Sequence, residues 1–175
     1  VIGDDEAIYC ETLTFDANRL EPQIALPDEV DKVVSVTEAA GEAIDQAYLG
    51  SCTNGRFEDL QEAARILKGR QVAAGVRMLV SPASQSIYQR ALREGVIETL
   101  ADAGAIILAP SCGACLGLHS GILAKGEKAI SSTNRNFVGR MGHKESQIFL
   151  GSPASVAAAA LEGRIADPRK YLQEG

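Results

Sequence analysis

The fold of this chain is decided by the stretch Ser-Cys-Gly-Ala-Cys-Leu-Gly at residues 111–117, which places two thiols three positions apart, at Cys112 and Cys115. The apolar run Ala-Ile-Ile-Leu-Ala comes just before it, at 105–109, and Pro110 ends that run. A short apolar run closed by proline and glycine predicts a buried strand that delivers a tight, cysteine-bearing loop at its C-terminal end.

A third thiol follows another strand-like run. Cys52 lies in the sequence Gly-Ser-Cys-Thr-Asn-Gly, directly after the apolar segment 47–50. Loops that leave the C-terminal ends of parallel strands meet at one edge of a sheet, so two such loops bring together residues that are far apart in sequence. The sequence therefore predicts that Cys52, Cys112 and Cys115 converge around one point.

Strand-like and helical segments alternate through most of the chain. Helical spacing of apolar residues or helix-ending glycines marks four segments, and short apolar runs mark the strands between them. The predicted helices are 57–67, 84–93, 96–102 and 153–161, and the predicted strands are 47–50, 76–81, 105–109, 128–132 and 147–150. This alternation predicts a three-layer α/β/α fold around a mostly parallel sheet, with ligands bound at the C-terminal strand ends.

Residues 1–42 differ from the remainder, because they are acidic and carry two prolines. Alternating apolar residues predict an edge strand within 6–15, and the valines of 33–36 predict another short strand. We interpret 1–42 as an arm or linker that packs on something else, and 43–175 as the α/β domain proper.

Composition limits the function classes. The 175 residues are 46% apolar but only 5% aromatic, and the net charge is −6, so no overall basic field attracts nucleic acid or an anionic membrane. No apolar run is long enough for a transmembrane helix, and no secretion signal is visible, which predicts a cytoplasmic protein. Four cysteines in such a chain indicate metal or redox chemistry rather than a disulfide scaffold.

Several chemistries fit the cysteines. A thioredoxin-type redox pair needs CxxC at the start of a helix and no third thiol. A structural zinc site needs four ligands, and His119 follows Cys112 at a spacing outside the common zinc motifs. Three thiolates suit a [4Fe–4S] cluster that leaves one iron open to water or substrate, where it acts as a Lewis acid on a hydroxyl. Buried, inert cysteines are the remaining interpretation.

A second polar constellation follows the predicted strand 128–132. Residues 133–140 read Thr-Asn-Arg-Asn-Phe-Val-Gly-Arg and pack two arginines and two asparagines into one loop. Arginine binds carboxylates through paired hydrogen bonds, and an acidic chain needs such local positive charge to hold an anionic ligand. A solvated surface loop is the alternative. Together with the thiols, the loop predicts a site where a metal cluster handles a substrate hydroxyl and arginines hold its carboxylates.

Three motifs in this order resemble the aconitase superfamily, most closely its branch of 3-isopropylmalate dehydratase and homoaconitase large subunits. They are YLGSCTNG at 48–55, PSCGACLG at 110–117 and STNRNFVGRMG at 132–142. The resemblance continues through GSPASV at 151–156 and covers nearly the whole chain.

The resemblance implies a [4Fe–4S] cluster on Cys52, Cys112 and Cys115, and stereospecific dehydration and rehydration of a hydroxy-di- or tricarboxylate. It further implies that substrate contacts come from the 133–140 loop and that one polar side chain lies near the cluster. The implied substrate residues are Asn134, Arg135 and Arg140, and the implied cluster neighbour is Asn54.

Large subunits of this branch are more than twice as long, and the resemblance implies a separate small subunit that carries the swivelling domain and the catalytic base. We therefore interpret the chain as the third, cluster-ligating domain of a hydro-lyase of leucine biosynthesis, with no catalytic residue assigned in it. Alone, it is expected to be inactive, and whether the isolated domain retains the cluster is left open by the sequence. Homoaconitase, another hydroxy-acid dehydratase, an iron or oxygen sensor and a structural zinc module are the alternatives.

Overall fold

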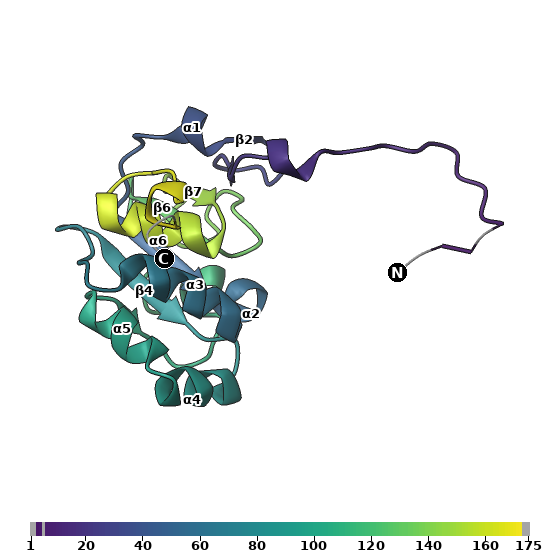
Figure 1. Cartoon of the computed structure of the whole chain (residues 1–175). Coiled ribbons are helices and arrows are strands. Elements are labelled where there is room, and N and C mark those ends of the chain that lie inside the picture. Colours follow the sequence, from purple (N-terminus) through teal and green to yellow (C-terminus); the bar gives the residue numbers. More distant parts are fainter. Residues whose placement is uncertain (1–2, 5, 173–175) are drawn as a thin grey trace.

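The computed structural model describes residues 3–4 and 6–172, and its core is one mixed sheet (Figure 1). The strands are β1 (Gln23–Ala25), β2 (Val33–Ser35), β3 (Gln46–Gly50), β4 (Arg77–Ser81), β5 (Ile106–Ile107), β6 (Lys128–Ser131) and β7 (Gln147–Leu150). The α-helices are α1 (Val36–Ala39), α2 (Ser51–Asn54), α3 (Phe57–Leu67), α4 (Gln85–Arg93), α5 (Val96–Asp102), α6 (Pro153–Glu162) and α7 (Arg169–Leu172), and the 3₁₀-helices are η1 (Ala17–Arg19) and η2 (Gly113–Leu116).

The described strands lie in the order β2-β1-β7-β6-β3-β4-β5. The strands from β7 to β5 are parallel to one another, whereas β1 runs antiparallel to both β2 and β7. The parallel strands therefore all end at the same edge of the sheet, as predicted. The loops that carry the cysteines and the arginines leave from this edge.

The two faces of the sheet are covered differently. Successive strand side chains point to opposite faces, so Leu49 and Val80 pack under α3, α5 and α6, while Tyr48 and Leu79 pack on the other face. That second face is covered by η2 and by the loops 108–127 and 133–146, which contribute buried residues such as Met141. The α/β fold and the mostly parallel sheet are confirmed, but loops rather than long helices form the third layer.

Local sequence explains the principal helices. α3 buries Phe57 and Leu60 on one side, and the Asp59 side chain accepts a 3.0 Å hydrogen bond from the backbone N–H of Arg56 at the helix start. α6 begins at Pro153 after the N-cap Ser152, whose Oγ accepts from the backbone N–H of Ser155. Its alanines are almost fully buried, since small side chains let the helix lie close to β3 and α3.

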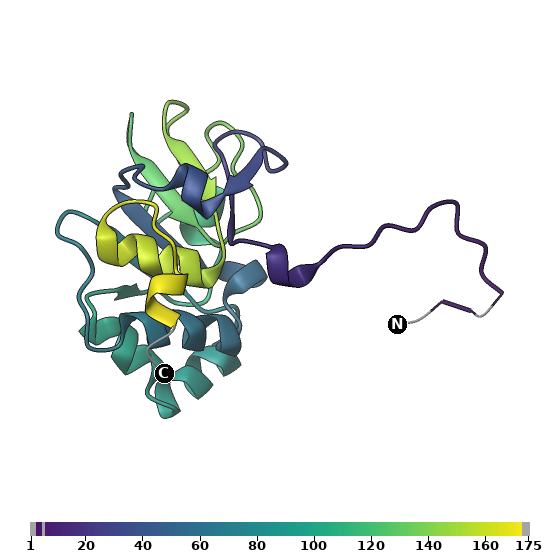
Figure 2. The same ribbon diagram turned by 45° about the horizontal axis from the view of Figure 1, so that its top comes forward.

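The N-terminal stretch does not form the predicted edge strand. Residues 6–16 make no strand and run away from the body of the molecule in both ribbon views (Figures 1 and 2). Ile8 and Phe15 are exposed, and no described strand pairs with this stretch. The predicted strand at 33–36 is confirmed as β2, which with β1 extends the sheet beyond β7.

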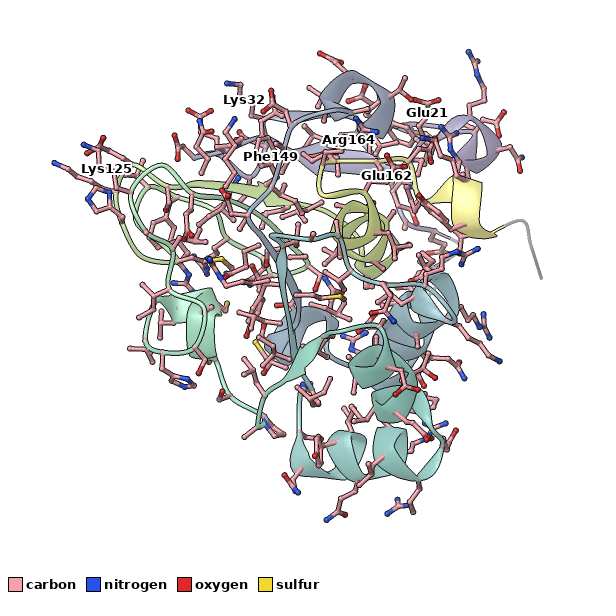
Figure 3. The ribbon with its side chains drawn as sticks, turned by 90° about the vertical axis from the view of Figure 1, so that its left-hand side faces the viewer. Glu21, Lys32, Lys125, Phe149, Glu162 and Arg164 are labelled. Atoms are coloured by element: carbon pink, nitrogen blue, oxygen red, sulfur yellow. The ribbon has the colours of Figure 1, made fainter. Side chains whose placement is uncertain are left out.

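The start of β1 is fastened to the C-terminal segment. Arg169 Nη2 lies 3.3 Å from a carboxylate oxygen of Glu21 and 2.6 Å from one of Asp167. Figure 3 shows Glu21, Glu162 and Arg164 on the same side of the molecule as the yellow C-terminal segment.

Among the described residues, none of the helices combines the length and the apolar character that a membrane span requires.

Candidate functional site

The loops at the C-terminal edge of the sheet are hydrogen-bonded to one another. The backbone N–H of Gly50 donates to Ser132 Oγ over 2.9 Å, and the N–H of Ser132 donates to the carbonyl of Tyr48 over 3.0 Å. The hydroxyl of Ser81 donates to the carbonyl of Ser111 over 3.0 Å. Hydrogen bonds therefore join the CxxC loop and the C-terminal ends of β3, β4 and β6 at this edge of the sheet.

Cys52 follows β3 through a tight backbone turn. Gly50 has φ +118°, and a Cβ there would lie 2.1 Å from the carbonyl oxygen of Ser81, so the close approach of β3 to β4 requires glycine. Ser51 is held at φ +61° and is buried, and its hydroxyl has no hydrogen-bond partner among the described atoms. This turn leaves the Cys52 side chain exposed at the sheet edge.

The CxxC segment forms the single 3₁₀ turn η2 rather than the start of a long helix. The backbone N–H of Cys115 donates to the carbonyl of Cys112 over 2.9 Å, and Gly117, at φ +66°, ends the turn. Cys115 is buried and Cys112 is exposed. Two thiols in one turn, one of them beneath the surface, can contribute two neighbouring ligands to a single site.

Tyr48 lies beneath this turn, a contact that the sequence analysis missed. Its side chain is fully buried, and its hydroxyl donates to the carbonyl oxygen of Cys112 over 3.3 Å. Burial disfavours the phenolate and raises the pKa of Tyr48 to about 12, against a smaller lowering by a hydrogen bond with Ser81. The phenol thus stays a neutral donor. The sequence showed only a tyrosine in the otherwise apolar run 47–50, and its partner was not readable from the residue pattern.

The loop after β6 brings one predicted arginine to the thiols. Arg140 Nη2 lies 3.9 Å from Cys115 Sγ, and the Arg140 guanidinium lies 5.3 Å from the centroid of the Phe137 ring. The Nε of Arg140 is buried without a hydrogen-bond partner among the described atoms. A half-buried guanidinium whose Nε–H has no partner, next to a thiol, favours negative charge at this position.

Asn134 and Arg135 lie farther along the same loop and are exposed. With Phe137 they line a cavity of about 540 Å³ whose other wall is the turn 28–31 between β1 and β2. The structure therefore places Arg140 at the CxxC turn and Arg135 beside an acidic turn. Asn54 donates through its side-chain amide to the carbonyl of Ser132, which links α2 to this loop.

Within the described residues, no group of three or more His, Cys, Asp or Glu side chains is arranged to hold a metal ion. The described cysteines are all free thiols. His119, considered as a zinc ligand, is hydrogen-bonded to Ser120 over 3.2 Å. The structure brings the loops of Cys52, Cys112 and Cys115 to one edge of the sheet. Their three sulfur atoms do not form a metal-binding group among the described residues.

Residues 37–163 match the aconitase family (aconitate hydratase). The chain belongs to the aconitase family. Curated relatives include the 3-isopropylmalate dehydratase large subunit 1 of Methanopyrus kandleri, 54% identical over 97% of this chain, and the large subunit of Geobacter sulfurreducens, 54% identical over 97%. That of a Sulfurihydrogenibium species is 55% identical over 95%.

The chain spans about 40% of the length of these relatives. The matched range of the aconitase family includes all three candidate cysteines and residues 133–140, the arginine loop. The family match confirms the resemblance seen in the three motifs. Membership in this family implies an iron–sulfur cluster.

Proposed function

We propose that this chain is the cluster-ligating part of the large subunit of an iron–sulfur hydro-lyase that interconverts 2-isopropylmalate and 3-isopropylmalate by dehydration and rehydration in leucine biosynthesis. The observation that carries the proposal is the identity of 49–55% to large subunits named for this reaction. The arrangement of thiols and arginines at one sheet edge supports it.

In this proposal Cys52, Cys112 and Cys115 hold the cluster. Their donor chemistry fits, because all three are free thiols in loops joined by hydrogen bonds, and the unpartnered Nε of Arg140 offers a compensating positive charge. When bound, a [4Fe–4S] cluster with three thiolate ligands leaves one iron open as a Lewis acid for a hydroxyl group. Asn54 fixes α2, which carries Cys52, against the loop after β6.

The arginine loop supplies the positive charge for a dicarboxylate. Arg135 is exposed and has no ion-pair partner among the described residues, so its guanidinium is free to bind a carboxylate through two hydrogen bonds. Arg140 lies where a ligand at the CxxC turn would approach. Asn134 presents a neutral amide beside Arg135. These three residues would bind and orient the substrate.

The groups that move protons are assigned to other parts of the enzyme. A small subunit that carries the swivelling domain is the proposed partner, since the relatives are named as large subunits. Residues 1–42 would lead in from the preceding domains, with β1 and β2 of this segment joining the sheet of the cluster domain, 43–175. The 175-residue chain alone is therefore expected to be inactive, and the working enzyme is expected to be cytoplasmic.

The test uses the full-length large subunit that contains this chain, purified without oxygen together with its small subunit. Interconversion of 2- and 3-isopropylmalate, measured by chromatography, is expected for the pair. Absence of this activity in a complex that holds iron and sulfide, with turnover of another hydroxy acid instead, would contradict the assigned substrate. Turnover by the 175-residue chain alone would contradict its assignment as an incomplete enzyme.

A further inference from the structure

The buried side chain of Asn136 joins two segments that lie more than one hundred residues apart in sequence. Its Nδ2 donates to the carbonyl oxygen of Leu26 over 2.7 Å and to that of Glu29 over 3.4 Å. Asn136 itself is fully buried, and its Oδ1 has no partner among the described atoms. The side-chain amide of Asn136 therefore acts as a hydrogen-bond donor to two backbone carbonyls of the other segment.

The two captured carbonyls belong to the turn between β1 and β2. The turn is closed at its base by the N–H of Leu26, which donates to the carbonyl of Lys32 over 2.8 Å. Asp28 within it has φ +77°, so the turn carries a left-handed residue. Asn136 therefore contacts a turn of fixed shape at the edge of the sheet, and this contact anchors the middle of the arginine loop.

The arginine loop is fixed firmly at its two ends. At the start, the N–H of Thr133 donates to Ser131 Oγ over 3.1 Å, and at the end, the N–H of Leu123 donates to the carbonyl of Met141 over 2.8 Å. Between them, among the described residues of 134–139, Asn136 is the one whose side chain hydrogen-bonds another segment. Without it, the middle of the loop would have no polar tether.

The tether lies between the two arginines that the proposed function uses. Arg135 precedes Asn136 directly and shares a cavity with the turn 28–31. On the other side, the ring of Phe137 lies 5.3 Å from the guanidinium of Arg140, which in turn contacts the Cys115 thiol. A shift of Asn136 would therefore move Arg135 directly and Arg140 through the Phe137 ring.

We propose that Asn136 is a positioning residue for substrate binding, which fixes the two arginines of its loop by anchoring that loop to the turn between β1 and β2. This inference rests on the proposed function. Arginine binds a carboxylate bidentately only when its fork is correctly placed, so a loosened loop weakens binding of the dicarboxylate more than it slows the chemical step.

The test compares Asn136→Ala with wild type in the full-length large subunit paired with its small subunit. We expect KM for isopropylmalate to rise roughly tenfold, the size expected for a lost buried hydrogen bond, with kcat changed much less. Iron and sulfide content should be unchanged. Hydrogen–deuterium exchange should become faster in peptides covering both 26–32 and 133–140, a readout that does not depend on activity.

A second variant, Asn136→Leu, keeps a side chain of similar size but removes its donor. Both carbonyls, of Leu26 and of Glu29, then lose the tether, while the turn 28–31 and its charges beside Arg135 stay unchanged. The same rise in KM is expected. The control is Asn18→Ala, because Asn18 is exposed and its side-chain bond is to Asp16 in the N-terminal stretch; its KM and exchange should match wild type.

The outcomes separate this inference from the proposed function. Absence of isopropylmalate turnover in the wild-type pair refutes the function, while the exchange data still test the tether. An active wild type with an unchanged KM and unchanged exchange in Asn136→Ala refutes the positioning role. Failure of both variants to fold also refutes it, because it would show that the contact is needed for the fold itself.

Discussion

The hydroxyl of Tyr48 donates a hydrogen bond to the carbonyl oxygen of Cys112, over 3.3 Å, from beneath the CxxC turn. A central strand thereby holds the loop that carries two of the three candidate ligands. The contact explains how a short 3₁₀ turn that begins at Gly113 and is followed by Gly117 keeps one position.

Substituting Tyr48→Phe should lower the free energy of unfolding by about 1 kcal/mol, because the carbonyl of Cys112 loses its donor while the ring still fills the core. Urea denaturation of the chain measures this change. Tyr88→Phe is the control, since Tyr88 is partly buried and its hydroxyl has no hydrogen bond in the described structure. Equal effects of the two substitutions would contradict a specific role for the Tyr48 hydroxyl.

The raised pKa of Tyr48 predicts a pH dependence at the alkaline end. The phenol titrates near 10 when unfolded and at about 12 when folded, so between these values the folded chain binds more protons. The free energy of unfolding that Tyr48 contributes is therefore constant below about pH 9 and falls by about 1–2 kcal/mol as pH rises toward 12. The difference between wild type and Tyr48→Phe isolates this part. A difference that does not vary with pH would count against it.

Substituting Gly50→Ala should destabilise the chain by more than about 3 kcal/mol, since the new methyl group would collide with the backbone carbonyl of Ser81 at a positive φ. Gly126→Ala is the matched control. Gly126 also has a positive φ, of +77°, but nothing lies within 4 Å of an added Cβ, so it should cost only about 1–2 kcal/mol. Thermal or urea unfolding that ranks the two in the opposite order would be inconsistent with the observed packing.

Substituting Arg140→Gln in the full-length complex should raise KM for isopropylmalate by roughly tenfold or more, because a charged, bidentate donor beside Cys115 is lost. Arg140→Lys should recover only part of this loss, since an ammonium group lacks the planar fork. Steady-state kinetics measures both. Arg65→Gln, on the exposed side of α3, is the control. Wild-type kinetics in Arg140→Gln would remove Arg140 from the site.

Much of the fold could be predicted because local signals and tertiary packing agree. α3 and α5 begin and end at the predicted residues, where periodic apolar positions meet glycine. β5 is shorter than the predicted run 105–109, because it lies at the edge of the sheet and pairs only with β4. The run 6–15 has alternating apolar residues, but alternation alone does not create a strand when no partner strand is available.

The site could be predicted only in part. The shared edge of the three cysteine loops follows from parallel strands, and this was readable from sequence. The contacts of Tyr48 and Asn136 were not, because each side chain bonds to backbone atoms of a distant segment, and a carbonyl oxygen leaves no trace in the residue pattern. The sequence likewise does not show that Arg140 lies at the CxxC turn and Arg135 beside the acidic turn 28–31, because both positions depend on tertiary structure.

The central claim is that three cysteines of this chain hold an iron–sulfur cluster. Its most direct test measures iron and sulfide per chain, together with the electron paramagnetic resonance spectrum, after anaerobic reconstitution of the full-length large subunit. Wild type is compared with serine substitutions at Cys52, Cys112 and Cys115 and, as a control, at Cys10, an exposed free cysteine in the N-terminal stretch. Loss of the cluster in the first three variants, and a wild-type cluster in Cys10→Ser, is the predicted result. A full, spectroscopically unchanged cluster in Cys52→Ser would contradict the account.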